Sequence, residues 1–114
     1  MVILKFAMVL FLLGLILLTT IRSSPGALSG GPYYYAAPAN DPNPVGPRWR
    51  RNLMQVKRLK AWWEAWYDSR GRLVELRRKE AGVEQFRVTY LWGPGGRLRA
   101  RQWSQGGRVF RIDP

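Results

Sequence analysis

The first twenty-one residues contain an apolar run that cannot belong to the core of a small water-soluble domain. Residues 6–18 read FAMVLFLLGLILL, and residues 2–21 extend this run with Lys5 as its only charge. Twenty helical residues rise about 30 Å, the thickness of the hydrocarbon core of a bilayer. We therefore expect residues 1–22 to form a transmembrane anchor. A cleaved signal peptide is the alternative, although Ala27-Leu28-Ser29 offers only a weak cleavage site.

The charges beside the apolar run predict its orientation. Lys5 and the amino terminus precede the run and Arg22 follows it, whereas Arg48, the next basic residue, lies beyond the usual flanking window. This balance favours a cytoplasmic amino terminus. We expect a single-pass membrane protein whose C-terminal domain lies outside the cytoplasm.

Residues 23–47 have the composition of a linker. They hold six of the eight prolines, and their only charged side chain is Asp41. Proline favours extended segments and interrupts helices and ladders, so we expect a tether. Three adjacent tyrosines in this tether, Tyr33, Tyr34 and Tyr35, are candidates for an adhesive patch or an interfacial belt, or are spacer residues.

Residues 48–114 form a basic region with seventeen Lys and Arg against six Asp and Glu, so that they carry nearly all of the net charge of +12. We expect a partner with an acidic or polyanionic surface. The 114-residue chain has neither Cys nor His, which excludes disulfides, thiolate or imidazole metal sites and His-based catalysis. Glu64 and Asp68 are expected to form ordinary ion pairs. We therefore predict a protein that is not an enzyme and has no cofactor or metal.

The basic region begins with a helical spacing and continues with strand patterns. A spacing of three and four relates Trp49, Leu53, Val56, Leu59 or Lys60, Trp63 and Trp66. It is typical of an amphipathic helix that packs on a sheet, or that docks on a membrane surface or an acidic partner. From Trp62 the period changes, because residues 61, 63, 65 and 67 can alternate on one face. Residues 86–92 alternate strictly, with Phe86, Val88 and Tyr90 expected inward and Arg87 and Thr89 outward.

These patterns together predict an α+β protein. It would comprise an N-terminal transmembrane helix, a Pro-rich linker, a short amphipathic helix and a small antiparallel β-meander of four to five strands.

One turn of this meander carries a recognisable motif. Residues 67–73 read YDSRGRL and resemble the tyrosine–aspartate (Rhs or YD) repeat, which pairs Tyr-Asp with Gly-Arg-Leu after two free residues. Residues 96–98 repeat Gly-Arg-Leu, and residues 107–109 repeat it more faintly. The resemblance covers less than half of the chain and implies a β-hairpin in an exported or surface protein.

Two functions are consistent with these features. The first is a non-catalytic, membrane-tethered accessory or structural subunit that docks on the acidic surface of a larger membrane-associated protein complex, through Trp49, Trp62, Trp63, Trp66 and the three tyrosines. The second is an exported or anchored binder of nucleic acid or another anionic envelope polymer. The candidate residues for the second function are Arg87, Arg97, Arg99, Arg101, Arg108 and Arg111.

Overall fold

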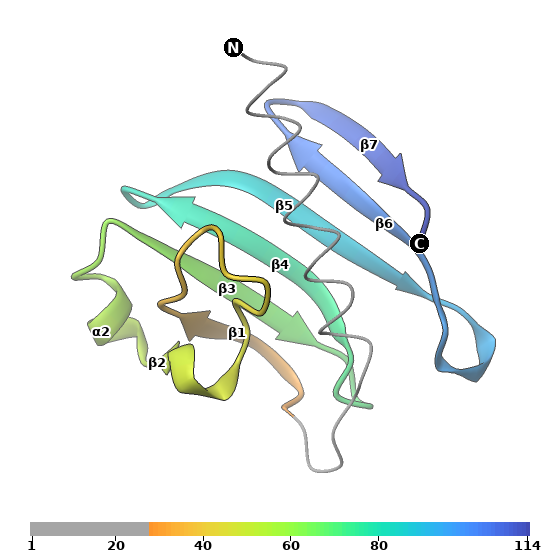
Figure 1. Ribbon diagram of the computed structural model, residues 1–114, viewed down its shortest axis with the longest axis horizontal. Coiled ribbons are helices and arrows are strands. Elements are labelled where there is room, and N and C mark those ends of the chain that lie inside the picture. The colour runs from red at the N-terminus through yellow and green to blue at the C-terminus, as the bar shows by residue number, and fades with distance from the viewer. Residues whose placement is uncertain (1–27) are drawn as a thin grey trace.

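The computed structural model describes residues 28–114, which form one antiparallel sheet of seven strands (Figure 1). In chain order the strands are β1 (Gly30–Tyr35), β2 (Arg50–Arg51), β3 (Ala61–Tyr67), β4 (Leu73–Glu80), β5 (Val83–Trp92), β6 (Leu98–Gln105) and β7 (Arg108–Ile112). Across the sheet the order is β2-β1-β3-β4-β5-β6-β7. The strands from β3 to β7 are therefore a meander, and β1 is inserted between β2 and β3.

The predicted α+β class is wrong, because residues 28–114 form a seven-stranded antiparallel sheet with almost no helix. The amphipathic helix expected from the spacing of three and four is reduced to α2 (Leu53–Val56), and the other helical turns are η1 (Pro47–Trp49) and η2 (Pro94–Gly96). Asn52 and Gln55 form a capping box that starts α2. The tryptophans beyond it pair in β3, because an aromatic run gains more from cross-strand packing than from a helix.

The expected linker also contains a strand. Tyr33 and Tyr35 of β1 pair with Ala65 and Trp63 of β3, and Tyr34 and Tyr35 pair with Arg51 and Arg50 of β2. Pro32 lies at a break in the register between Gly30 and Tyr33, where its missing N–H leaves no ladder bond unmade. The Pro-rich tether of the predicted fold is thus wrong for residues 30–35, which lie inside the sheet.

The predicted anchor, residues 1–22, lies outside the described residues. Within residues 28–114 no helix is long and apolar enough to cross a membrane.

One face of the sheet carries an aromatic core. The alternation predicted for β5 is confirmed, since Phe86, Val88 and Tyr90 are buried and the residues between them are half-buried on the other face. The Phe86 ring stacks on Trp103 with a centroid distance of 4.4 Å and meets the edge of Trp63 at 5.5 Å. The core cluster comprises Tyr35, Ala37, Trp63, Ala65, Leu73, Leu76, Phe86, Val88, Tyr90 and Trp103.

The segment between β1 and β2 covers part of this face, and Figure 1 shows it crossing in front of the sheet. Val45 and Trp49 pack against the core cluster. The buried Arg78 of β4 donates a hydrogen bond of 3.0 Å from Nη1 to the carbonyl oxygen of Ala37. The Arg78 guanidinium also lies 5.0 Å from the centroid of the Trp63 ring. Residues 36–49 are therefore fastened to the sheet and extend its core.

The alternation in β5 is testable with one matched pair of variants. Val88→Asn places an amide in the apolar face, and we expect it to lower the free energy of unfolding by about 3 kcal/mol. Thr89→Asn makes a similar change on the half-buried polar face and should cost less than about 1 kcal/mol. Chemical denaturation followed by circular dichroism measures both values, and equal losses would contradict the assigned faces.

Candidate binding surfaces

The outward face of β4 and β5 carries a neutral network of ion pairs. Arg77 lies 2.7 Å from Glu75 and 3.6 Å from Glu84, while Arg87 lies 3.1 Å from Glu84 and 3.7 Å from Glu75. The hydrogen bond that Arg87 donates to Glu84 raises the pKa of its guanidinium. Two carboxylates thus neutralise two guanidinium groups. Arg87 forms its ion pairs within the fold and is not a free cation for a polyanion.

The candidate docking aromatics of β3 are used mainly inside the protein. Trp63 is 0% exposed, so it cannot contact a partner in this fold. Trp62 is 8% exposed, and its Nε1 donates to Glu64 Oε2 at 3.1 Å. Trp66 is half-buried, with the guanidinium of Arg77 at 4.3 Å from its ring centroid.

The other candidate aromatics are also engaged in the fold. The Tyr35 and Tyr67 hydroxyl groups share a hydrogen bond of 2.8 Å, and burial together with the Tyr35 hydroxyl raises the pKa of Tyr67. Tyr33 meets the Tyr67 ring edge at 5.8 Å, whereas Tyr34 is half-buried on the opposite face. Trp49 donates to Asp41 Oδ2 at 2.9 Å. The structure therefore divides the seven aromatics between both faces and forms no single aromatic docking surface from them.

The arginines around β6 are likewise separated. Arg101 pairs with Tyr90 across the strands and is 5% exposed, and burial lowers the pKa of its guanidinium. A register shift opposite Leu91 and Trp92 breaks the alternation, so the expected row of Arg97, Arg99 and Arg101 does not form. The exposed candidates are Arg97, Arg99, Arg108 and Arg111.

Ion pairing leaves a large positive surface charge. Six of the seven Asp and Glu lie beside an arginine, and the seventh, Glu64, accepts the Trp62 hydrogen bond. Among residues 28–114, ten exposed or half-buried Lys and Arg make no ion pair. They are Arg50, Arg51, Lys57, Arg58, Lys60, Arg70, Lys79, Arg97, Arg99 and Arg108.

The first candidate surface lies at the end of the sheet where β3 begins and β4 meets β5. Leu53, Met54 and Leu59 are 40%, 68% and 39% exposed, although they are large apolar side chains. Val83, the first residue of β5, is 61% exposed. The turn before it contacts this segment through a 2.7 Å hydrogen bond from the Ala81 amide to the carbonyl of Lys60. Lys57, Arg58 and Lys60, which follow α2 in the same segment, are also exposed. We name this set the α2-end surface: Leu53, Met54, Leu59, Val83, Lys57, Arg58 and Lys60.

Sequence reasoning found the basic, amphipathic character of residues 48–66 but assigned the contact to the tryptophans. Leu53 and Leu59 belonged to the predicted stripe, and Met54 did not. Because β3 takes the tryptophans into the sheet, the apolar residues that remain outside are those before it. The absence of any acidic residue from position 42 to position 63 was the available signal for this surface.

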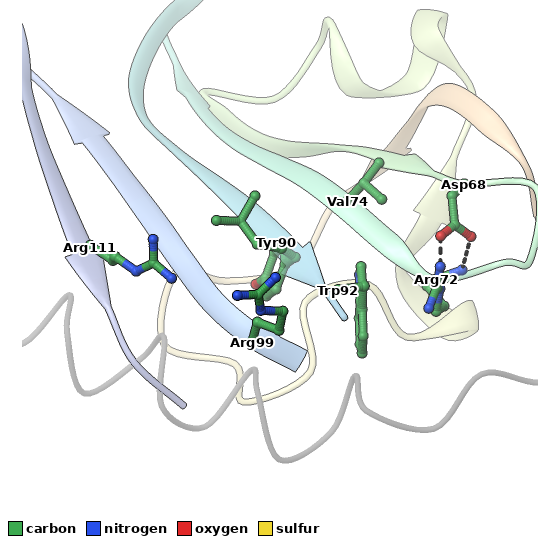
Figure 2. A pocket seen from close by; sticks show the side chains of 8 residues that line it. Asp68, Arg72, Val74, Tyr90, Trp92, Arg99 and Arg111 are labelled. Carbon is green, nitrogen blue, oxygen red and sulfur yellow. Dashed lines mark hydrogen bonds and ion pairs between the residues drawn. The ribbon is translucent and has the colours of Figure 1, made fainter. Parts of the chain in front are cut away.

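The second candidate surface is a hollow of about 460 Å³ at the opposite end of the sheet (Figure 2). Trp92 forms one wall, and its Nε1 donates to the carbonyl of Leu73 at 2.8 Å. The Arg72 guanidinium lies 5.3 Å from the centroid of the Trp92 ring and 2.8 Å from Asp68 Oδ2. We name this hollow the arginine groove; it is lined by Asp68, Arg72, Val74, Tyr90, Leu91, Trp92, Arg99 and Arg111.

Asp68, the only acidic residue of the arginine groove, is engaged by its own turn. Its Oδ1 accepts hydrogen bonds of 2.9 Å from the amides of Arg70 and Arg72. Partial burial would raise the pKa of the Asp68 carboxyl, but these bonds and the Arg72 guanidinium together hold that pKa below its usual value. The turn closes the β3–β4 hairpin that the resemblance to the tyrosine–aspartate repeat implied.

The described residues contain no group of three Asp or Glu placed to hold a metal ion. Comparison of the whole chain with known protein families, with curated proteins and with solved structures finds no match. The two surfaces must therefore be interpreted from their own chemistry.

The Asp68 turn predicts a dependence of stability on pH. The pKa of Asp68 is lower in the folded protein than in the unfolded chain. Asp68 therefore stabilises the fold at pH values above the usual carboxyl pKa, and this contribution disappears as the pH falls through the folded pKa. Asp68→Asn keeps an acceptor for the amides but loses the charge. We expect it to lower the free energy of unfolding by about 1 kcal/mol at neutral pH. The difference should vanish in acid, and denaturation curves that show a pH-independent loss would contradict the role of the charge.

Proposed function

We propose that this protein is a non-catalytic, membrane-tethered accessory subunit that docks on the acidic surface of a larger membrane-associated protein complex. The observation that carries the proposal is the α2-end surface, where three exposed apolar side chains lie within a segment that has no acidic residue. The tryptophans named from the sequence stabilise the sheet, and Leu53, Met54 and Leu59 take their place at the interface.

The chemistry of the α2-end surface suits an acidic protein partner. Unbranched and branched aliphatic side chains supply apolar area, while Lys57, Arg58 and Lys60 supply charge around it. Exposed charges steer association and select partners of the opposite sign, and a desolvated apolar centre supplies most of the affinity. Met54 adapts readily to a partner's contour because its side chain is flexible.

Membrane attachment rests on the apolar run of residues 2–21. With the amino terminus in the cytoplasm, the sheet would lie on the outer side of the membrane. The accessory function needs this attachment, because it raises the local concentration of the sheet beside a membrane complex and so strengthens a weak contact.

Extraction from native membranes tests the attachment. We expect the full-length protein to remain in the membrane fraction after washing with high salt and with alkaline carbonate, and to be released by detergent. Leu12→Arg and Leu13→Arg, introduced together, should release it, because charges at the centre of an apolar segment oppose insertion. Arg58→Gln serves as the control and should leave the distribution unchanged. Release of the unaltered protein by carbonate would contradict the anchor.

Photo-cross-linking tests the docking. We expect a photo-reactive phenylalanine analogue in place of Met54, in the full-length protein in its native membrane, to give a discrete protein adduct. The same analogue at the exposed Ser69, at the other end of the sheet, should not give it. Reversal of two charges, Lys57→Glu with Arg58→Glu, should lower the yield about fivefold or more because it repels an acidic partner.

The matched control is Arg70→Glu with Arg97→Glu, which changes the net charge equally at the other end and should leave the adduct intact. Equal losses from both pairs would show that net charge alone determines the contact. Adducts at position 54 made only of lipid or only of nucleic acid would overturn the protein-docking function.

A further inference from the structure

The arginine groove takes no part in the proposed docking, because it lies at the opposite end of the sheet. We infer that the arginine groove binds a phosphate group, carried either by an anionic lipid headgroup or by free phosphate. Its lining has three arginines against one carboxylate, and that carboxylate is occupied by its own turn.

Two of the arginines are available for an anion. Arg99 is exposed and makes no ion pair among the described residues. Arg111 lies 3.6 Å from Asp113, with side chains 57% and 83% exposed, and such a loose surface pair contributes little. Figure 2 shows the guanidinium groups of Arg99 and Arg111 pointing toward one another. A phosphate between them would replace their repulsion by charge-assisted hydrogen bonds, for which the guanidinium fork is suited.

The remaining lining holds this arrangement in place. A Cβ added at Gly93 would lie 2.6 Å from both Cγ and Cδ of Arg99, so glycine allows the Arg99 stem to run closely along the β5–β6 turn. Arg72 is fixed between Asp68 and the Trp92 ring and adds positive potential without having to move. Arg72 and the stem of Arg99 are therefore held in place before an anion binds, which reduces the entropy lost on binding.

The path of the chain brings this groove toward the membrane. Gly30 pairs with Tyr67, next to Asp68 in the groove lining, so β1 begins at the groove end of the sheet. Seven residues lie between Arg22 and Gly30, and such a segment reaches at most about 30 Å. If residues 2–21 span the bilayer, as the proposed function requires, the groove lies within reach of the headgroups. This step alone rests on the proposed function, and it favours a lipid as the source of the phosphate.

Titration of the full-length protein in a neutral detergent tests the inference. The probes are inorganic phosphate, short-chain phosphatidylglycerol and short-chain phosphatidylcholine, and the readout is the NMR shift of the Trp92 indole N–H, assigned with Trp92→Phe. We expect phosphatidylglycerol to shift this signal saturably. Arg99→Gln and Arg111→Gln should each weaken binding about tenfold. Arg58→Gln removes the same charge at the α2-end surface and should change binding less than about twofold.

The probes identify the source of the phosphate. If phosphatidylglycerol binds saturably and inorganic phosphate does not bind, the site recognises a lipid headgroup. If the two bind with equal affinity, the site recognises free phosphate. Equal binding of phosphatidylcholine and phosphatidylglycerol would overturn the inference, because the acyl chains would then be responsible. An equal loss of phosphatidylglycerol binding in Arg58→Gln would also overturn the inference. The same holds if a single-stranded oligonucleotide binds more tightly and the groove variants abolish its binding.

The two proposals fail separately. The Arg99→Gln variant should still give the protein adduct at position 54. The variant with Lys57→Glu and Arg58→Glu should lose that adduct but show the same Trp92 titration as the unaltered protein. Groove binding without a protein adduct at Met54 would refute the docking function alone. An adduct without groove binding would refute the phosphate site alone.

Discussion

The aromatic cluster of Trp63, Phe86 and Trp103 at the centre of the sheet determines how the rest of this protein is arranged. The three rings come from β3, β5 and β6, and their centroids lie 5.5 Å and 4.4 Å apart in turn. Large aromatics bury much area per residue, which a sheet of this size needs because it has few residues with which to build a core. The consequence is that most tryptophans become structural, and the surface is left to arginine, lysine and a few aliphatic side chains.

The aromatic core also explains why the segment before the meander cannot be a simple tether. An apolar face of a single sheet must be covered, and residues 36–49 cover part of it through Val45, Trp49 and the bond between Arg78 and Ala37. Tyr33 and Tyr35 of β1 extend the same face toward Tyr67. Proline supports this arrangement, because extended residues with few free N–H groups can cross a sheet without demanding ladder partners.

The limits of sequence reasoning follow from the same features. The strict alternation of residues 86–92 and the glycine turns identify β5 and its hairpins, because strand period and turn chemistry are local. The composition of residues 30–35 could not reveal β1, since its pairing with Ala65 and Trp63 is a long-range interaction. Alternation placed Arg101 in a row with Arg99, and only the register shift opposite Leu91 and Trp92 shows that it is buried. The distribution of charge along the sequence predicts where the candidate surfaces lie. Which residues form them depends on burial, which only the fold shows.

The distribution of charge gives the sheet two ends of different character. Acidic residues are concentrated where they complete the fold: Glu75 and Glu84 neutralise Arg77 and Arg87 on the outward face, and Asp68 closes a turn. Most of the excess cations lie at the two ends of the sheet. Around α2 they accompany exposed apolar side chains, whereas beside the turn of Gly93 three arginines line a hollow. Apolar area together with charge favours a protein surface, whereas a hollow lined by guanidinium groups favours a compact anion. Under the two proposals, a sheet attached to the membrane ahead of β1 presents the groove end to the headgroups and the α2 end to a protein partner.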